Sequence, residues 1–150
     1  MMGLLIWIEE SGLGIYVRED LWGFAIALSM HAVGMAMVLG VVVVTNLRVL
    51  GYVSDIPVLS YTNLFPAAWL GFAINLTSGI MLYVSHATEY TYQFVFMLKL
   101  GLLALGGVLM KVMMNFIRAN RDPFQVKLVA VICLASWIGA VITGRLMAYA

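Results

Sequence analysis

The chain has 150 residues, of which 64% are hydrophobic and 10% charged, and its mean hydropathy is +1.04. Soluble domains carry about 25% charged residues, so this composition excludes an ordinary soluble fold and indicates an integral membrane protein. The net charge of +1 gives no electrostatic footprint for nucleic acid. The single cysteine excludes a disulfide or a thiolate metal cluster within one chain.

Residues 1–20 precede the first long apolar run and mix apolar with acidic side chains. Leu4 and Ile8, for example, stand close to Glu9 and Glu10. This loosely helical pattern predicts an amphipathic helix that lies in the membrane interface. A poorly ordered tail is the alternative.

Four apolar stretches follow, and each is long enough to cross the hydrocarbon layer, which takes a helix of about 20 residues. The predicted spans are residues 21–48, 67–85, 94–116 and 124–148. Pro66 precedes the second span, at a position where proline commonly starts a helix. The connections are short apart from the 51–66 loop. The sequence therefore predicts one all-α membrane domain, an antiparallel bundle of four transmembrane helices.

Basic residues near the ends of the spans predict the orientation, since they mark the cytoplasmic side of a membrane protein. Arg48, Arg118 and Lys127 fall on one side of such a bundle, and the acidic Glu9 and Glu89 fall on the other. Both termini are therefore expected outside.

The few strongly polar side chains of the spans are concentrated in the outer half of the predicted bundle. His31 lies in the otherwise apolar run LWGFAIALSMHAVGMAMVLGVVVV, roughly 15 Å from its start at a rise of 1.5 Å per residue. Lys99, Arg145 and His86 lie nearer the outer ends of the other spans. An ionisable residue inside a span costs at least about 2.5–3.5 kcal/mol unless it finds a partner or water. The set therefore predicts a polar cavity that opens outward.

Each of these residues also has a plainer interpretation. Lys99 and Arg145 are close enough to the boundary for their long side chains to reach the headgroups. His31 is too deep and too short for that. Its neutral imidazole can instead bond a serine, a threonine or a backbone carbonyl of a neighbouring helix.

Several short patterns give the chain a family resemblance over nearly its whole length. They are W-x-E-x-S from Trp7, the run His31-Ala-Val-Gly34, TNLRVLG at 45–51, Pro66-Ala-Ala-Trp69, T-S-G at 77–79, F-x-x-K-L at 96–100 and GRLMAYA at 144–150. The chain resembles an uncharacterised family of small bacterial four-helix membrane proteins, which implies a bacterial inner (plasma) membrane. The histidine of the first span and the lysine early in the third are distantly similar to the membrane domain of copper resistance protein D and to the heme-binding four-helix protoporphyrinogen IX oxidases.

The resemblance to these oxidases implies a heme b with His31 as its axial metal ligand and Lys99 as a further important residue. Cations toward the outer face suit heme propionates, so Lys99 and Arg145 are the candidate partners there. His86 is the only other histidine, but it is expected to lie more than about 10 Å shallower than His31. We therefore prefer a five-coordinate heme, or a second ligand from methionine or lysine.

Together these features predict a membrane redox protein, or a subunit of a redox complex, that binds heme b in an outward-facing cavity and exchanges electrons with quinone. Copper held by His31 with Met30, Met35 and Met37 is the competing cofactor, for a copper-binding or copper-transport protein. A cofactor-free structural or assembly subunit, joined to other membrane subunits or to a second copy of the chain, is the remaining alternative. No hydrolytic constellation or nucleotide fingerprint accompanies these residues, which argues against an enzyme that acts on a soluble substrate. Whether the chain has another enzymatic activity stays open.

The predicted orientation is tested by reporter fusions along the chain. We expect the 51–66 and 117–125 loops inside, and residue 87 and both termini outside, because basic residues flank the two inner loops. A C-terminal reporter that is active only inside the cell would contradict this topology and the outward-facing cavity with it.

Overall fold

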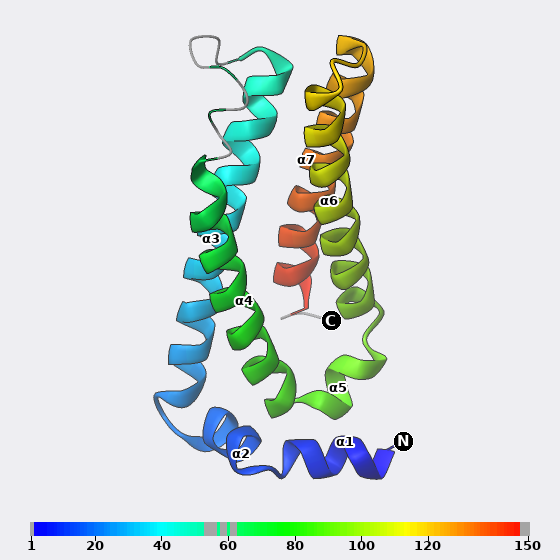
Figure 1. The fold of residues 1–150 in the computed structure, drawn as a ribbon. Helices are drawn as coiled ribbons and strands as arrows, with labels where there is room; N and C mark the ends of the chain where they lie inside the picture. The colour runs from blue at the N-terminus through cyan, green and yellow to red at the C-terminus, as the bar shows by residue number, and fades with distance from the viewer. Residues whose placement is uncertain (1, 53–56, 58–59, 61–62, 148–150) are drawn as a thin grey trace. The chain divides into compact units, whose positions relative to one another are not determined.

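The computed structural model describes residues 2–52, 57, 60 and 63–147 (Figure 1), and over these residues it contains helices and no strand. The helices are α1 (Met2–Glu9), α2 (Gly12–Glu19), α3 (Gly23–Leu50), α4 (Phe65–Ser85), α5 (Ala87–Tyr92), α6 (Phe94–Arg118) and α7 (Pro123–Leu146). The prediction of an all-α protein is confirmed.

The predicted membrane spans are helices of the structure. Four helices of the described residues, α3, α4, α6 and α7, are long and apolar enough to cross a membrane. Pro66 is the second residue of α4, where its missing N–H is not needed for an intrahelical bond. Asp122 is the N-cap of α7 and its side chain accepts a hydrogen bond from the Phe124 N–H at 3.0 Å. Residue 148 and much of the predicted 51–66 loop lie outside the described residues.

Two stretches differ in detail from the prediction. Residues 2–19 form two short helices, where the sequence pattern predicts one amphipathic helix. The break follows from Ser11, whose hydroxyl accepts a hydrogen bond from the Gly14 N–H at 3.2 Å and so starts a new helix. In addition, the connection between the second and third spans contains the short helix α5, which was not predicted.

The described chain divides into two compact units. Unit 1 comprises Met1–Val38 and Pro66–Gln93, and unit 2 comprises Leu39–Phe65 and Phe94–Ala150. Helix α3 contributes to both units, since the division falls after Val38.

In unit 1, glycines allow α3 and α4 to pack closely. A methyl group added to Gly34 would lie 2.6 Å from both the backbone nitrogen of Asn75 and the carbonyl oxygen of Gly71. One added to Gly71 would lie 2.5 Å from the Cβ of Met37. Small residues allow such backbone contact in membrane helix pairs, where van der Waals packing is a main attractive force. Because earlier residues of α3 meet later residues of α4, the two helices run in opposite directions.

In unit 2, α6 and α7 run in opposite directions and pack along their length. Near the turn between them, a core cluster is formed by Met113, Met114, Val126 and Ala130. Further along, a methyl group on Gly139 would contact Leu102.

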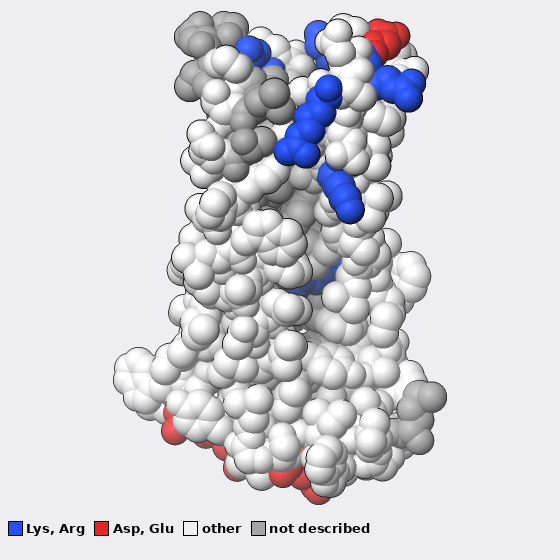
Figure 2. All heavy atoms as spheres, in the orientation of Figure 1, with Lys and Arg blue, Asp and Glu red and all other residues white. Residues whose placement is uncertain are grey.

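Charged side chains lie mainly outside the middle of the long helices. Most of the Lys and Arg side chains of unit 2 gather at the end where α6 turns into α7 (Figure 2), whereas the Asp and Glu residues of unit 1 lie on or next to the short helices α1, α2 and α5. This distribution is the one that a membrane-spanning chain needs, because the hydrocarbon layer cannot solvate charges.

The close packing of α3 on α4 predicts a sharp difference between two glycines of the same helix. Gly34→Ala should lower the free energy of unfolding by about 1–3 kcal/mol, because the new methyl group forces backbone apart. Gly40→Ala should be neutral or stabilise by up to about 1 kcal/mol, since nothing lies within 4 Å of its added methyl group. Thermal unfolding in detergent measures both. Equal effects would contradict the packing described here.

Candidate functional site around His31

The imidazole of His31 contacts α4 in unit 1. Its Nδ1 lies 3.1 Å from the carbonyl oxygen of Asn75 and 3.3 Å from the hydroxyl oxygen of Ser78. The Ser78 hydroxyl also lies 2.7 Å from the carbonyl oxygen of Ile74, to which it donates its proton. Both neighbours of Nδ1 are therefore acceptors.

We assign the tautomer of His31 from this contact. A backbone carbonyl oxygen carries no proton, so the contact with Asn75 is a hydrogen bond only if Nδ1 carries the hydrogen. In a neutral imidazole, Nε2 then holds the lone pair. Metal-ligating histidines commonly have this arrangement, in which one ring N–H donates to a carbonyl and the other nitrogen binds the metal.

The bond between His31 and Asn75 is reciprocal. The side-chain amide of Asn75 donates to the carbonyl oxygen of His31 at 2.8 Å, while the ring of His31 donates to the carbonyl oxygen of Asn75. The ring also packs beside Gly79, since a methyl group there would lie 3.3 Å from Cε1 of the imidazole. Asn75 and Gly79 thus determine where the ring can lie.

The other predicted site residues have their own surroundings. His86, just after α4, lies with its Nδ1 2.9 Å from the Ser85 hydroxyl and its ring centroid 5.8 Å from that of Tyr90. Seven residues separate it from Gly79, beside which the His31 ring packs, and this corresponds to roughly 10 Å at the helical rise. The difference in membrane depth between the two histidines stays a prediction.

Lys99 and Arg145 belong to unit 2, whereas His31 and His86 belong to unit 1. The side chain of Lys99 crosses from α6 to α7, where a methyl group on Gly144 would lie 3.3 Å from its Cε. Arg145 is the next residue of α7 and its side chain is exposed. The structure therefore brings these two cations to the same part of unit 2. The cavity that would join them to His31 stays a prediction.

The residues that the structure describes contain no group of three or more His, Cys, Asp or Glu side chains that could hold a metal ion. A metal at His31 would therefore need ligands of another kind, either the nitrogens of a porphyrin or the thioethers of nearby methionines.

Sequence reasoning did not identify a buried polar group in unit 2. Asn46 donates to the Val42 carbonyl at 2.7 Å and to Sγ of Cys133 at 3.9 Å, and Cys133 donates to the Gly106 carbonyl at 3.5 Å. The indole of Trp137 packs on Gly106, where a methyl group would lie 2.7 Å from Nε1. Among the buried side-chain atoms of the described residues, Asn46 Oδ1 and Trp137 Nε1 have no hydrogen-bond partner. A donor and an acceptor of this kind suit an ordered water.

A second feature that was not predicted is the contact between α1 and α5. One carboxylate oxygen of Glu9 accepts hydrogen bonds from the backbone N–H of Thr88 at 2.8 Å and from its hydroxyl at 2.7 Å. Burial by itself raises the pKa of Glu9, but these hydrogen bonds and the nearby charges of Arg18 and His86 outweigh it, so the pKa is lowered from 4.5. The only sequence signal was the glutamate of the W-x-E-x-S pattern.

Comparison of the chain with family models, with curated proteins and with solved structures gives no match. The family resemblance of the sequence therefore stays a prediction.

The Glu9–Thr88 contact predicts a pH-dependent attachment of α1. A carboxyl with a lowered pKa in the folded state contributes stability above its unfolded pKa and loses it as the pH falls through the folded value. Amide exchange of α1 and α5, corrected for its intrinsic pH dependence, should therefore accelerate below about pH 4.5. In Glu9→Gln, the amides of α1 and α5 should exchange faster already at pH 7, and their exchange should show no further acceleration as the pH falls. Glu10→Gln is the control, because Glu10 is exposed. An acceleration at low pH that persists in Glu9→Gln would contradict the role given to Glu9.

Proposed function

We propose that the chain is a membrane redox protein, or a subunit of a redox complex, in which His31 is the axial ligand of a heme b. The observation that carries the proposal is the hydrogen bond from Nδ1 to the Asn75 carbonyl at 3.1 Å. It orients the ring and assigns the lone pair to Nε2, as in metal-ligating histidines.

The donor chemistry at His31 fits a heme. A porphyrin brings its own four nitrogens, so the protein needs to supply an oriented imidazole and a cavity lined by apolar side chains. His31 supplies the first, held by Asn75 and Ser78. Lys99 and Arg145 are proposed to hold the propionates. His86 does not suit the second axial position, because it follows the last residue of α4 and lies seven residues beyond Gly79, which is roughly 10 Å along the helix.

The proposal includes a complete arrangement in the membrane. The four long helices form an antiparallel bundle, α1 and α2 lie in the interface, and both termini face outward from a bacterial inner membrane. The gathering of basic side chains at the α6–α7 end of unit 2 supports this orientation (Figure 2). When bound, the heme would supply one-electron transfer, with quinone as the candidate partner.

A cofactor-free subunit is the second candidate, and the same hydrogen bonds favour it. Asn75 and Ser78 satisfy Nδ1 of His31, and the reciprocal Asn75 bond joins α3 to α4 without any ligand. In this case the role of His31 is to hold two helices together within a larger membrane complex. The copper alternative rests on the position of Met35, one helical turn from His31 on α3.

A visible spectrum distinguishes these functions. Protein made with ample heme supply and purified in detergent should show a reducible Soret band close to one heme per chain. His31→Ala and His31→Gln should both abolish or shift this band while the protein still folds, because neither side chain can replace the axial imidazole. His86→Gln is the matched control and should keep the wild-type spectrum.

The opposite results decide against heme. If wild-type protein lacks Soret absorbance and His31→Gln behaves normally, the heme proposal fails. Copper found at one atom per chain by metal analysis, and lost in His31→Gln, would establish the copper alternative instead.

A further inference from the structure

Four residues of unit 2, Asn46, Gly106, Cys133 and Trp137, form a polar group that joins α3, α6 and α7, and we call it the Asn46 group. Asn46 and Cys133 are 0% exposed and Trp137 is 8% exposed. The Asn46 amide reaches Sγ of Cys133 at 3.9 Å, and the Cys133 thiol donates to the Gly106 carbonyl at 3.5 Å. The Trp137 indole packs on the same glycine. Asn46 and Trp137 therefore flank one contact, the contact of Cys133 with Gly106.

Two atoms of the Asn46 group have no hydrogen-bond partner in the part of the chain that the structure describes, and they are of opposite kinds. The Val42 carbonyl can only accept, so the amide nitrogen of Asn46 faces it at 2.7 Å and Oδ1 is left as an acceptor. Nε1 of Trp137 can only donate. The Asn46 group therefore calls for a molecule that donates to Asn46 and accepts from Trp137.

The surrounding membrane cannot supply this molecule from its hydrocarbon. Trp137 lies in the interior of α7, which ends at Leu146 and is long and apolar enough to cross a membrane. Lipid tails offer neither donors nor acceptors, so a polar atom at this depth must find its partner inside the protein.

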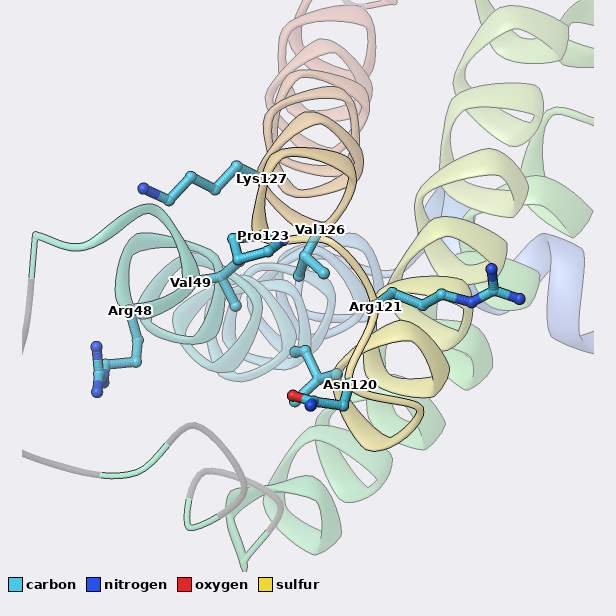
Figure 3. Close-up of a pocket in the computed structure, with 8 residues that line it drawn as sticks. Arg48, Val49, Asn120, Arg121, Pro123, Val126 and Lys127 are labelled. Carbon is cyan, nitrogen blue, oxygen red and sulfur yellow. The ribbon is translucent and has the colours of Figure 1, made fainter.

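The Asn46 group is also separate from the pocket of about 230 Å³ at the end of unit 2, where α6 turns into α7 (Figure 3). None of its four residues lines that pocket. Val126 does, and Cys133 lies seven residues further along α7, roughly 10 Å at the helical rise. Ala130, which belongs to the core cluster around Met113, lies between them along the helix. A molecule that reaches the Asn46 group must therefore be small.

The chemistry of the two atoms selects among small ligands. A metal cation would suit the oxygen of Asn46 but cannot accept from Trp137, and a simple anion would suit Trp137 but cannot donate to Asn46. Water does both, and buried waters commonly bond polar groups that have no other partner.

We propose that the Asn46 group is a hydration site, in which water accepts from Nε1 of Trp137 and donates to Oδ1 of Asn46. The water adds a second polar connection between α3 and α7 to the one that Asn46 makes with Cys133. The proposal does not depend on a cofactor at His31, which belongs to unit 1.

The test measures the contact between water and the indole hydrogen of Trp137 by NMR, on the full chain labelled with ¹⁵N-tryptophan. A detergent without hydroxyl groups avoids contacts that detergent hydroxyls would imitate. The Trp137 signal is assigned without changing the site, by replacing the exposed Trp7, Trp22 and Trp69 one at a time with phenylalanine. A rotating-frame Overhauser cross-peak with water should appear at this hydrogen, with the sign of a dipolar contact and not that of hydrogen exchange.

Three variants show whether the water is held by Asn46. Asn46→Leu should remove the cross-peak or weaken it several-fold, because the acceptor Oδ1 is gone; Asn46→Ala takes its place if that variant does not fold. Thr45→Val is the matched control and should keep the cross-peak, since Thr45 is also 0% exposed and its hydroxyl donates to the Val41 carbonyl of its own helix. Cys133→Ala should keep it too, which shows that the contact is not relayed by the thiol hydrogen.

Four results would overturn the proposal. The absence of a dipolar cross-peak in the wild-type chain would show a dry site, whatever the variants do. A cross-peak of unchanged strength without the Asn46 amide would show that Asn46 does not hold the water. Equal loss in Thr45→Val would indicate general loosening of the helices, and loss in Cys133→Ala would assign the contact to the thiol. Thermal unfolding of each variant confirms that it is folded before its cross-peaks are compared.

Discussion

His31 and Asn75 each bond the backbone carbonyl of the other residue, and this reciprocal pair fixes how α3 and α4 meet in unit 1. Hydrogen bonds between membrane helices contribute only about 0.6 kcal/mol on average, so their main effect is on geometry. They set the register of the helix pair, while the close contact of Gly34 with α4 supplies the packing. The tautomer of the imidazole follows from the same bond, and every proposal about His31 depends on that tautomer.

The buried polar side chains around His31 in unit 1 and around Asn46 in unit 2 differ in how completely they are hydrogen-bonded. At His31 the protein supplies acceptors for Nδ1 and a donor for the backbone carbonyl. In unit 2, by contrast, Asn46 Oδ1 and Trp137 Nε1 are buried without a protein partner. An unsatisfied buried group costs about 1–3 kcal/mol, and an ordered water bonded to each of these atoms would remove that cost.

The four long helices were readily predicted from the sequence, whereas the contacts between side chains were not. Apolar runs of about 20 residues identify spans directly, and Pro66 indicates where one of them begins. His31 is conspicuous because an imidazole is costly in an apolar run. Its partner Asn75 gives no such signal, since the partner depends on which helix faces meet. The contact between Glu9 and Thr88 joins residues far apart in the chain, and no local periodicity encodes it.

The tautomer of His31 is the most direct test of this account. Nitrogen NMR of protein labelled with ¹⁵N-histidine, with His31 and His86 assigned by substitution, distinguishes a protonated ring nitrogen from one that carries a lone pair. The account predicts that Nδ1 of His31 is protonated and Nε2 is not. Asn75→Leu removes the hydrogen bond from the Asn75 side-chain amide to the His31 carbonyl, so it should alter the His31 signals and leave those of His86 unchanged. A hydrogen on Nε2 with a bare Nδ1 would contradict the bond to the Asn75 carbonyl and, with it, the axial role proposed for this histidine.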